Sequence, residues 1–402
     1  MSTPAGRFYD DPPRIVMMVT SHITAGAFLP GLLQHFSLAG WNVTVISSPG
    51  EGLDRLSRLD GVHVLSLPMH RDPAVISDLK ALIRLGRALR NIAPEVVLTA
   101  TPKASLLGTV VARTSKVPLV IHLMWGLRSE TLRGPRRALV LAFETVATRF
   151  SHRVIANSRS LAAELVRLRM VPPRRLTVLG AGSANGVDTS RFRSRLESAS
   201  PGKETICSRL DGLGPGPVIG FVGRINPDKG VGVLLEAVEK LWLAGHSFRL
   251  LLVGVTEDSS LADRIADARA RGRPVLLLQN EEDVLPLFQA MDIHCLPSLR
   301  EGFPTVCLEA SACGLPTVTT DATGAVDSVI PGITGLVVHK NDVESLAHGL
   351  RTLLVDHDMR IRLGAAAREW IEREFDAELV CRRHEQYLRQ LYLQKVRRPA
   401  RG

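Results

Sequence analysis

The chain has 402 residues, which is too long for one ordinary hydrophobic core and favours two domains. Hydrophobic residues make up 45% and charged residues 22% of the sequence, a composition that excludes a disordered or fibrous protein. The net charge of +10 favours a polyanionic partner: nucleic acid, an anionic membrane or a phosphorylated substrate. Nucleic acid is the weakest of these choices, because the basic residues are scattered or paired and form no run interleaved with aromatic residues.

The cysteines and the first residues bear on the compartment. Five cysteines occur without a CxxC pair or a metal-ligand spacing, so we expect free thiols, no metal and a reducing cytoplasm. Residues 1–14 contain Asp10, Asp11 and three prolines before any apolar run, unlike a signal peptide. No stretch reaches the roughly 18 apolar residues that a spanning helix needs. We therefore expect a cytoplasmic protein, with membrane contact limited to the periphery of the inner face.

Short β-branched runs alternate with longer helical stretches from residue 14 onward, which predicts a parallel sheet with helices on both faces. Residues 14–20 are expected to form the first strand, followed by a loop over 21–26 and a helix over 29–39. Further strands of this unit are predicted at 42–47, 62–67, 96–99, 119–123 and 154–156. We expect a first domain over residues 1–195.

Residues 196–216 are rich in Ser, Gly, Pro and charge, and are the predicted linker. A second α/β unit is expected over 217–376, with a helix over 231–242. Its strands are predicted at 218–222, 249–253, 276–278, 293–296, 317–319 and 336–338. Residues 377–402 are predicted to form a last, basic helix. The fold class is therefore α/β, with two doubly wound domains.

One glycine-rich stretch, from Gly223 to Gly230, follows a predicted strand and precedes a helix. Gly223 permits a sharp turn, and Gly230 opens a helix whose first amides can meet a phosphate. Arg224 and Lys229 add two cations, so the stretch predicts a diphosphate clamp. The alternative is an ordinary strand-to-helix turn with two solvated charges.

A second strand-to-helix connection, from Pro297 to Ala310, contains Glu301 and Glu309. Glu301 is expected at the carboxyl end of a strand, where open α/β sheets bind ligands. Gly302 allows close backbone approach, and Phe303, Pro304, Thr305 and Val306 form a predicted helix N-terminus that suits a phosphate. Glu309 can accept two hydrogen bonds from a ribose diol. The alternative reading makes both glutamates surface residues.

These motifs resemble family 4 glycosyltransferases of the GT-B architecture. The similarity covers residues 14–392, and its most specific parts are the Gly223–Gly230 stretch, the Glu301–Glu309 spacing and the run 331–338. In the first half, the stretches at 47–50, 101–104 and 185–188 resemble a subgroup that builds bacterial surface polysaccharides or lipid-linked oligosaccharides. The resemblance implies two Rossmann-like domains facing across a cleft, with the last helix returning to the first domain.

The resemblance also implies retaining transfer of a sugar from a nucleotide donor, usually UDP-linked, to an acceptor hydroxyl. Arg224 and Lys229 would then neutralise the diphosphate, Glu301 would lie near the sugar, and Glu309 would hold the ribose. Gly26 would place backbone amides by the phosphate, and Asn280 would lie near the base. No Asp-x-Asp sequence occurs, so no metal and no other cofactor are expected.

The first half departs from the family pattern at two places. Relatives often carry a His before the Gly that follows the fifth strand, whereas this chain has Trp125-Gly126, with His122 three residues earlier. His122 is therefore a candidate for catalysis or acceptor orientation, and the alternative is a packed, hydrogen-bonded histidine. The loop at Gly26 has one glycine where relatives commonly have two.

Three other features have open interpretations. Lys103 either meets an acceptor phosphate or is a solvated loop cation. The Asn185–Asp188 stretch is either a structural turn and cap or a substrate contact. Residues 128–153 combine several arginines with an apolar run, so this segment either rests on an anionic leaflet or packs on the core.

The main hypothesis is a glycosyltransferase acting on a lipid-linked or polysaccharide acceptor at the membrane face. The alternatives are an enzyme with a soluble small-molecule acceptor, a nucleotide-sugar-binding protein without catalysis, and a nucleotide-sugar epimerase of GT-B type. The intact set of Arg224, Lys229, Glu301 and Glu309 argues against loss of catalysis.

Overall fold

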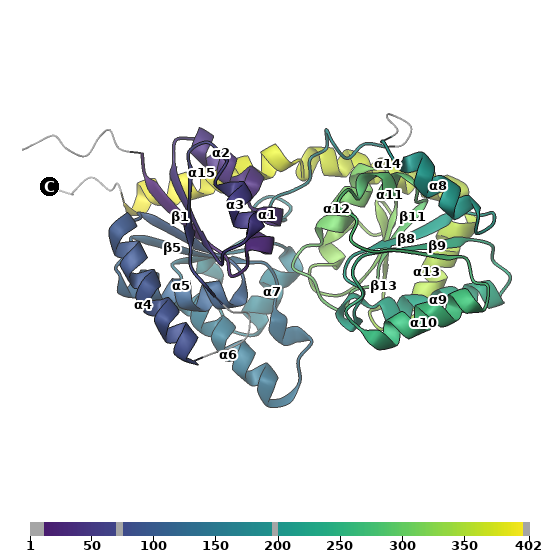
Figure 1. Ribbon diagram of the computed structural model, residues 1–402, viewed down its shortest axis with the longest axis horizontal. Coiled ribbons are helices and arrows are strands. Elements are labelled where there is room, and N and C mark those ends of the chain that lie inside the picture. Colours follow the sequence, from purple (N-terminus) through teal and green to yellow (C-terminus); the bar gives the residue numbers. More distant parts are fainter. Residues whose placement is uncertain (1–11, 70–74, 195–199, 397–402) are drawn as a thin grey trace, which may run out of the picture. The chain divides into compact units, whose positions relative to one another are not determined.

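The computed structural model describes residues 12–69, 75–194 and 200–396, and they form two α/β units (Figure 1). Unit 1 comprises residues 1–156, 165–180 and 380–402, and unit 2 comprises residues 157–164 and 181–379. All pairings between described strands are parallel.

Unit 1 is built on a seven-stranded sheet in the order β3-β2-β1-β4-β5-β6-β7. Its strands are β1 (Arg14–Met18), β2 (Asn42–Ser47), β3 (Val62–Ser66), β4 (Val96–Thr99), β5 (Leu119–Met124), β6 (Arg153–Ala156) and β7 (Leu176–Thr177). The order reverses direction between β1 and β4, which is the doubly wound arrangement expected from the alternating pattern.

Helices cover both faces of the unit 1 sheet (Figure 1). One face packs on α1 (His22–Phe28), α2 (Pro30–Leu38), α3 (Glu51–Leu56) and the last helix, α15 (Ala377–Lys395). The other packs on α4 (Val75–Ile92) and α5 (Pro102–Thr114), and α6 (Gly134–Phe150) lies beside α5. Strand β1 is apolar on both sides, because Ile15 and Met17 pack on the first face of the sheet and Val16 and Met18 pack on the second. Both faces must therefore be shielded from water by helices.

Unit 2 repeats this plan with six strands in the order β10-β9-β8-β11-β12-β13. Its strands are β8 (Val218–Val222), β9 (Arg249–Val253), β10 (Val275–Leu278), β11 (Ile293–Leu296), β12 (Thr317–Thr320) and β13 (Gly335–Val338). Helices α9 (Val231–Leu243), α10 (Ser259–Ala270) and α13 (Val343–Val355) pack on one face. The other face is covered by α8 (Lys203–Asp211), α11 (Leu285–Gln289), α12 (Thr305–Ala312) and α14 (His357–Glu374).

The predicted strands are confirmed, several of them with unchanged bounds, but three details of the first half differ. The expected loop over 21–26 is wrong, because Ser21 caps α1 and its hydroxyl accepts a hydrogen bond from the Ile23 amide at 3.3 Å. The short strand β7 has only two residues, too few for a periodic pattern. Helix α7 (Arg159–Arg167) begins in unit 2 and ends in unit 1.

The domain boundaries also differ from the prediction. The chain passes to unit 2 after Gly180 rather than after residue 195. The predicted linker 196–216 contains α8, and in this helix Leu210 is buried in the core of unit 2 while Ile206 packs partly against it. Low periodicity hid this helix, since only one of its faces contacts the core. The last helix belongs mainly to unit 1, as expected, because Cys381, Leu388 and Leu391 are buried there.

Candidate active site

The two sequence motifs follow neighbouring strands at the point where the unit 2 sheet reverses its order. β8 leads into the 223–230 stretch and β11 leads into the 297–304 stretch, and β8 pairs with β11. In open α/β sheets, ligands bind at the carboxyl ends of the strands at this reversal. The topology of unit 2 therefore brings both motifs to its candidate ligand site.

Hydrogen bonds tie the two loops together. Leu299 N donates to the carbonyl of Asp228 at 2.9 Å, and the Arg300 guanidinium donates to the Asp228 carboxylate at 2.8 Å. Gly230, with φ +69, lies against the carbonyl of Pro297, where no β-carbon would fit. These contacts fix the 223–230 and 297–304 loops against each other, and together they form one wall of the candidate site.

Lys229 and Glu301 form an ion pair across these loops. Lys229 Nζ donates to Glu301 Oε1 at 2.6 Å, and the hydroxyl of Ser298 donates to the same oxygen at 2.6 Å. The two side chains are only 20% and 11% exposed, so solvent screens the pair weakly. A short turn, Pro227–Lys229, positions the lysine, because the Asn226 side chain accepts a hydrogen bond from Lys229 N at 3.1 Å.

The backbone of Glu301 is fixed as well. Glu301 N donates to the carbonyl of Thr323 at 2.8 Å, and Gly324, with φ +76, packs directly against the carbonyls of Glu301 and Gly302. Ser298 and Thr323 did not stand out in the sequence. Ser298 offered a signal, since it is a polar residue at a strand end within the glutamate motif.

The start of α12 adds backbone donors to this wall. Pro304 precedes the helix and makes no side-chain cap, and no described residue accepts from the first amides, those of Thr305 and Val306. Phe303 instead turns its ring into the core, where its centroid lies 5.2 Å from that of Phe375. In residues 303–306 it is therefore the backbone N–H groups, and not the side chains, that are available to bind an anion.

Glu309 lies further along α12 and is half-buried. No described residue donates a hydrogen bond to its carboxyl group, and burial raises the pKa of Glu309 to about 7 although Arg191 opposes the shift. Because Glu309 is only half-buried, its carboxylate oxygens can accept hydrogen bonds from water or from a ligand. The geometry therefore suits a ligand that supplies hydroxyl donors.

Arg224 does not contact Glu301. Its guanidinium pairs with Glu257 at 2.9 Å, and the Asn226 amide also donates to Glu257 at 2.7 Å. The Arg224 side chain is 57% exposed, so it is free to turn toward a ligand. The sequence did not single out Glu257, which lies 33 residues away in the chain.

Two further predicted donor residues lie at carboxyl ends of strands in unit 2. Gly223 directly follows β8, and its amide donates to the carbonyl of Val253 at 2.9 Å. Asn280 follows β10 after one residue, is exposed and has a positive φ of 58°. Both positions agree with the expected loops, and their contact with a ligand stays a prediction.

The Asn185–Asp188 stretch forms a local turn and cap, and a substrate contact by this stretch stays a prediction. Gly186 turns with φ +64, and the Asp188 carboxylate accepts hydrogen bonds from the backbone of Ser190 and Arg191, both at 3.0 Å. These bonds, with that of the Ser190 hydroxyl, lower the pKa of Asp188 against the opposing effect of burial, which is the largest single influence. The carboxylate serves as a local cap.

Three predicted site residues belong to unit 1: Gly26, predicted to bind the donor, and Lys103 and His122, predicted on the acceptor side. Gly26 lies inside α1, where its α-carbon packs against the Gly52 backbone, so the structure contradicts a loop there and explains the glycine by close packing. Lys103 is the second residue of α5, at the carboxyl end of β4, and is half-buried. Thr20 helps to cap this helix, because Ala104 N donates to its hydroxyl at 3.1 Å.

His122 lies within β5, and all six residues of that strand are buried. Its Nδ1 lies 3.3 Å from the hydroxyl and 3.2 Å from the carbonyl of Thr99, and burial lowers the pKa of His122 to about 4. This is the packed, hydrogen-bonded arrangement, and a role for His122 on the acceptor side stays a prediction. Trp125, just beyond β5, is half-buried against Phe28, with ring centroids 5.9 Å apart.

No group of three or more His, Cys, Asp or Glu side chains within the described ranges is arranged to hold a metal ion. No helix in this part of the chain has the length and apolar content that a membrane crossing requires.

Comparisons with known proteins match both units. The model for glycosyl transferases group 1 matches residues 212–370, and that for Glycosyltransferase Family 4 matches residues 28–191. The capsular polysaccharide biosynthesis glycosyltransferase CapM of Staphylococcus aureus is 30% identical over 87% of this chain and 90% of its own length. An Escherichia coli UDP-Gal:alpha-D-GlcNAc-diphosphoundecaprenol alpha-1,3-galactosyltransferase is 26% identical over 75% of this chain and 77% of its own.

Solved structures support the fold. A glycosyltransferase from Rickettsia africae has a TM-score of 0.77 at 19% identity, covering 97% of this chain and 100% of its own. Anabaena HepE, solved with UDP-glucose, has a TM-score of 0.76 at 19% identity, covering 94% of this chain and 99% of its own. With both halves matched by family models and CapM aligned over most of its length, the chain belongs to glycosyltransferase family 4 and has the GT-B fold.

Proposed function

We propose that the protein transfers a sugar from a UDP-sugar to a hydroxyl of a lipid-linked or polysaccharide acceptor, with retention at the anomeric carbon. The observation that carries the donor half is the wall formed by Lys229, Glu301 and the start of α12. The names of two relatives support the acceptor class: CapM acts in capsular polysaccharide biosynthesis, and the E. coli enzyme is named for UDP-Gal and a diphosphoundecaprenol acceptor.

In this proposal the chain itself stabilises the leaving nucleotide diphosphate. Lys229 and the first amides of α12 meet the phosphate oxygens, and Arg224 turns from Glu257 to join them. Charge-assisted hydrogen bonds aimed at the leaving group stabilise the transition state in which its negative charge develops. Glu309 accepts the ribose hydroxyls, and Glu301 lies toward the sugar. We propose that these groups suffice without a metal ion.

Calorimetric titration with UDP, GDP and ADP tests the donor half. We expect one diphosphate, UDP, to bind, and the affinity to fall by about tenfold or more in Lys229→Ala, which removes one charge-assisted contact. If none of the three binds, the assigned donor site is wrong. Transfer from the matching UDP-sugar to an undecaprenol-diphosphate-linked sugar, compared with a soluble glycoside, then separates the lipid-linked acceptor from the small-molecule alternative.

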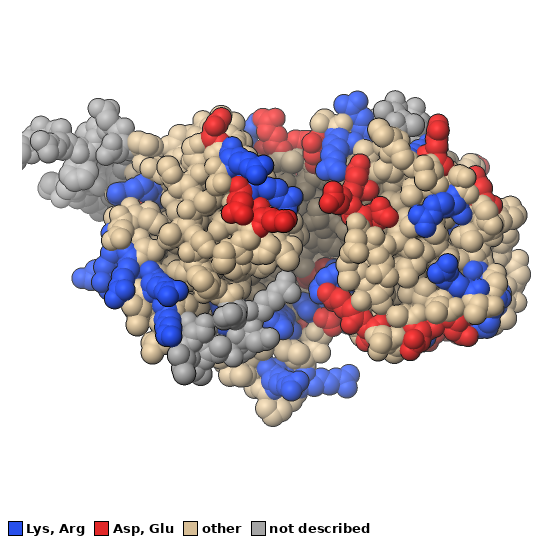
Figure 2. Space-filling view, viewed as in Figure 1, with Lys and Arg blue, Asp and Glu red and all other residues tan. Residues whose placement is uncertain are grey.

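We further propose that unit 1 contacts the inner face of the membrane from the cytoplasm. Figure 2 shows basic side chains gathered over α4 and near the start of α6. On α4, Leu79 and Ile83 are 58% and 51% exposed, and the neighbouring Arg84 and Arg87 are exposed. On α6, Leu139 is 52% exposed. Exposed apolar residues flanked by cations suit the surface of an anionic leaflet.

Sedimentation with phosphatidylcholine vesicles, with and without phosphatidylglycerol, tests this contact. We expect binding only to the anionic vesicles, weakened in Arg84→Gln/Arg87→Gln. The matched control is Arg55→Gln/Arg58→Gln, which removes two exposed cations at and just after α3 in the same unit. If both variants lose vesicle binding equally, net charge alone explains the binding, and a contact through α4 is contradicted.

A further inference from the structure

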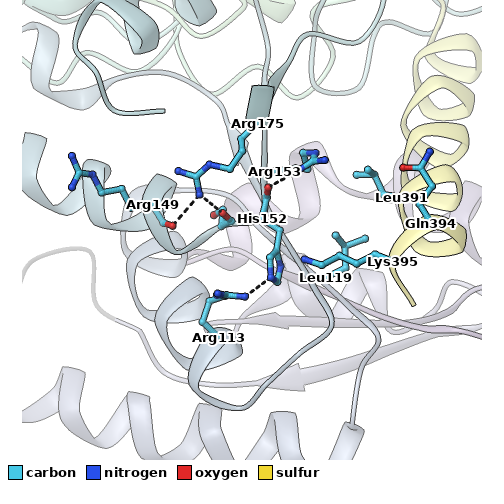
Figure 3. Close-up of a pocket in the computed structure, with 10 residues that line it drawn as sticks. Arg113, Leu119, Arg149, His152, Arg153, Arg175, Leu391, Gln394 and Lys395 are labelled. Atoms are coloured by element: carbon cyan, nitrogen blue, oxygen red, sulfur yellow. Dashed lines mark hydrogen bonds between the residues drawn. The ribbon is translucent and has the colours of Figure 1, made fainter. Parts of the chain in front are cut away.

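Unit 1 contains a second basic site, at the amino ends of its strands. A cavity of about 450 Å³ lies where β5 and β6 begin and where α5, α6 and α15 end (Figure 3). The cations that line it are Arg113, Arg149, Arg153, Arg175 and Lys395. Lys103 and the other acceptor-side candidates lie toward the opposite, carboxyl edge of this sheet, so the cavity is separate from them. Nothing in the proposed transfer reaction uses it.

Acidic side chains do not balance these cations. Within the described ranges, no carboxylate pairs with any of the five and none lines the cavity. Elsewhere in the chain, partly exposed arginines do have such a partner, as Arg264 does in Glu236 at 3.1 Å. The five charges therefore meet with only backbone groups and solvent to oppose them.

The three helix ends offset only part of this charge. Arg113, Arg149 and Lys395 lie in the last turns of α5, α6 and α15, where cations favourably oppose the helix dipole. Each helix end is equivalent to roughly half an elementary negative charge. Three such ends balance fewer than two of the five cations, so stabilisation of helix ends does not account for the cluster.

The cations affect one another. The pKa of Lys395 is lowered to about 8, first by burial and then by Arg113 and Arg153. The pKa of Arg175 is also lowered, first by burial and then by neighbouring arginines, among them Arg153. Some of their donors are used: Arg175 donates to the carbonyl of Ser151 at 3.0 Å, and Arg153 donates to that of His152 at 3.0 Å.

At the centre of the cluster, two N–H groups face each other. His152 Nδ1 accepts a hydrogen bond from Val120 N at 2.9 Å, which places the proton of the neutral ring on Nε2. The Arg113 guanidinium contacts this Nε2, and Figure 3 shows Lys395 approaching the same ring from another side. Because burial and the nearby cations lower the pKa of His152 to about 4, the ring is neutral at pH 7. An acceptor oxygen placed beside both groups would give each N–H a partner.

A neighbouring cavity extends the site. It has a volume of about 490 Å³, shares Arg149 and Arg175 with the first, and is lined further by Arg169 and by apolar residues that include Val166 and Met170. The two cavities together place several cations beside apolar side chains. This arrangement suits a phosphate that carries an organic portion.

We propose that this basic cavity of unit 1 binds a phosphate or diphosphate group, free or borne by a lipid headgroup, at a site separate from the sugar donor. Guanidinium groups bind phosphate oxygens through paired N–H donors, and several are directed into one cavity here. The proposal is independent of the proposed transfer reaction, since all of its residues belong to unit 1.

Calorimetric titration of the full chain with inorganic pyrophosphate, in the presence of excess UDP, tests the proposal. We expect Arg153→Gln/Lys395→Gln to weaken pyrophosphate binding by about tenfold or more, since it removes two charge-assisted contacts. The Arg55→Gln/Arg58→Gln control should bind as the unchanged protein does. Equal pyrophosphate affinity in the unchanged protein and in Arg153→Gln/Lys395→Gln would overturn the proposal, as would equal losses in both variants.

Thermal unfolding separates a lost site from a damaged fold. Without added phosphate, we expect Arg153→Gln/Lys395→Gln to unfold at the same temperature as the unchanged protein or higher, because two repelling charges are gone. Pyrophosphate should raise the unfolding temperature of the unchanged protein and of the control but not of this variant. A rise of equal size in all three would place the bound phosphate elsewhere and overturn the proposal.

Vesicles distinguish the two sources of the phosphate. If pyrophosphate displaces the protein from phosphatidylglycerol-containing vesicles, and Arg153→Gln/Lys395→Gln binds those vesicles less than the control does, the cavity accepts a headgroup. The ligand is instead a free phosphate compound if neither added pyrophosphate nor Arg153→Gln/Lys395→Gln alters vesicle binding, while the variant still loses pyrophosphate binding.

Discussion

Lys229 and Glu301, 72 residues apart in the chain, place Nζ and Oε1 within 2.6 Å of each other at the end of β11. Each side chain is mostly buried, and each lies in a loop fixed by backbone hydrogen bonds. The lysine proposed to contact a phosphate and the carboxylate proposed to lie near the sugar thus hold each other in place in the unliganded protein. The pair links the stability of this loop to its proposed chemistry.

The Lys229→Met variant separates these two roles. It leaves the Glu301 carboxylate nearly buried without a cation, so we expect the free energy of unfolding to fall by about 2 kcal/mol. The transfer rate should fall by about 100-fold or more, because the leaving group loses a cation. Urea unfolding and initial rates measure the two effects.

The double variant Lys229→Met/Glu301→Gln is the matched control. It removes both charges, so we expect most of the lost stability to return while activity stays low. A double variant as unstable as the single one would show that packing of the lysine stem, rather than charge pairing, stabilises the loop. Full activity in either variant would remove both residues from the reaction.

Glu309→Gln should change stability and binding in opposite directions. The pKa of Glu309 is raised from 4.5 to about 7, so between these values the native state holds a proton that the unfolded state has lost. The stabilising contribution of the protonated group is therefore lost as the pH rises through 7. At pH 8 we expect the neutral Gln variant to be more stable than the unchanged protein by about 3 kcal/mol.

UDP affinity should fall by about tenfold in Glu309→Gln, because the ribose diol loses an anionic acceptor. In the unchanged protein, affinity should rise from pH 6 to pH 8 as the carboxylate forms. The 2′-deoxy analogue of UDP is the control: it should bind the unchanged protein less tightly than UDP, and the two should bind the variant alike. A variant that still distinguishes them would place the ribose elsewhere.

Arg224→Ala tests whether an exposed arginine turns to the donor. Both side chains of its ion pair with Glu257 are exposed, so the free energy of unfolding should change by less than about 1 kcal/mol. UDP affinity should fall by about tenfold, while uridine, which has no phosphate, should bind unchanged. Glu257→Gln is the matched control, since it leaves Arg224 in place without its ion-pair partner. We expect UDP affinity in that control to be equal or higher, and a loss like that of Arg224→Ala would identify Glu257 as the ligand-binding group.

His122 should make the protein sensitive to acid. Its pKa falls from 6.5 to about 4, so the unfolded state binds more protons in this range and stability declines as the pH is lowered from 6.5 to 4. The full difference is about 3 kcal/mol, and we expect His122→Gln to remove it. Urea unfolding at pH 5 and pH 7.5 measures the change. Acceptor KM provides the second readout: a several-fold increase with unchanged UDP affinity would support the acceptor-side role, whereas unchanged KM would leave His122 a packing residue.

Metal removal tests the proposed leaving-group stabilisation. Because Lys229, Arg224 and the α12 amides are proposed to suffice, we expect transfer rates to remain within about twofold after dialysis against EDTA, a difference of less than roughly 0.5 kcal/mol in the barrier. A large loss that Mg²⁺ or Mn²⁺ restores would show that the charge balance at the diphosphate is incomplete without a cation. UDP titration with and without the metal would then locate its effect.

Much of the fold and of the donor site was predictable from local sequence. Strands such as β2, β4 and β8 have the predicted bounds, because a buried parallel strand is a short, nearly continuous apolar run. Lys229 and Glu301 were predictable as neighbours, because each follows a strand and parallel strands end at one edge of a sheet. Helix α1 was missed, since the packing of Gly26 on Gly52 is not visible in either segment alone.

The sequence by itself determined the order of elements and the position of the two strand-to-helix loops of the candidate donor site, because these depend on apolar periodicity and on residues close together in the chain. Only the tertiary structure decided that Arg224 pairs with Glu257, that burial raises the pKa of Glu309, and that the chain leaves unit 1 after Gly180. The basic cavity belongs to this second group, since its cations come from positions between 113 and 395. Ion pairing, desolvation and cavity shape depend on distances between residues remote in sequence, and folding alone sets those distances.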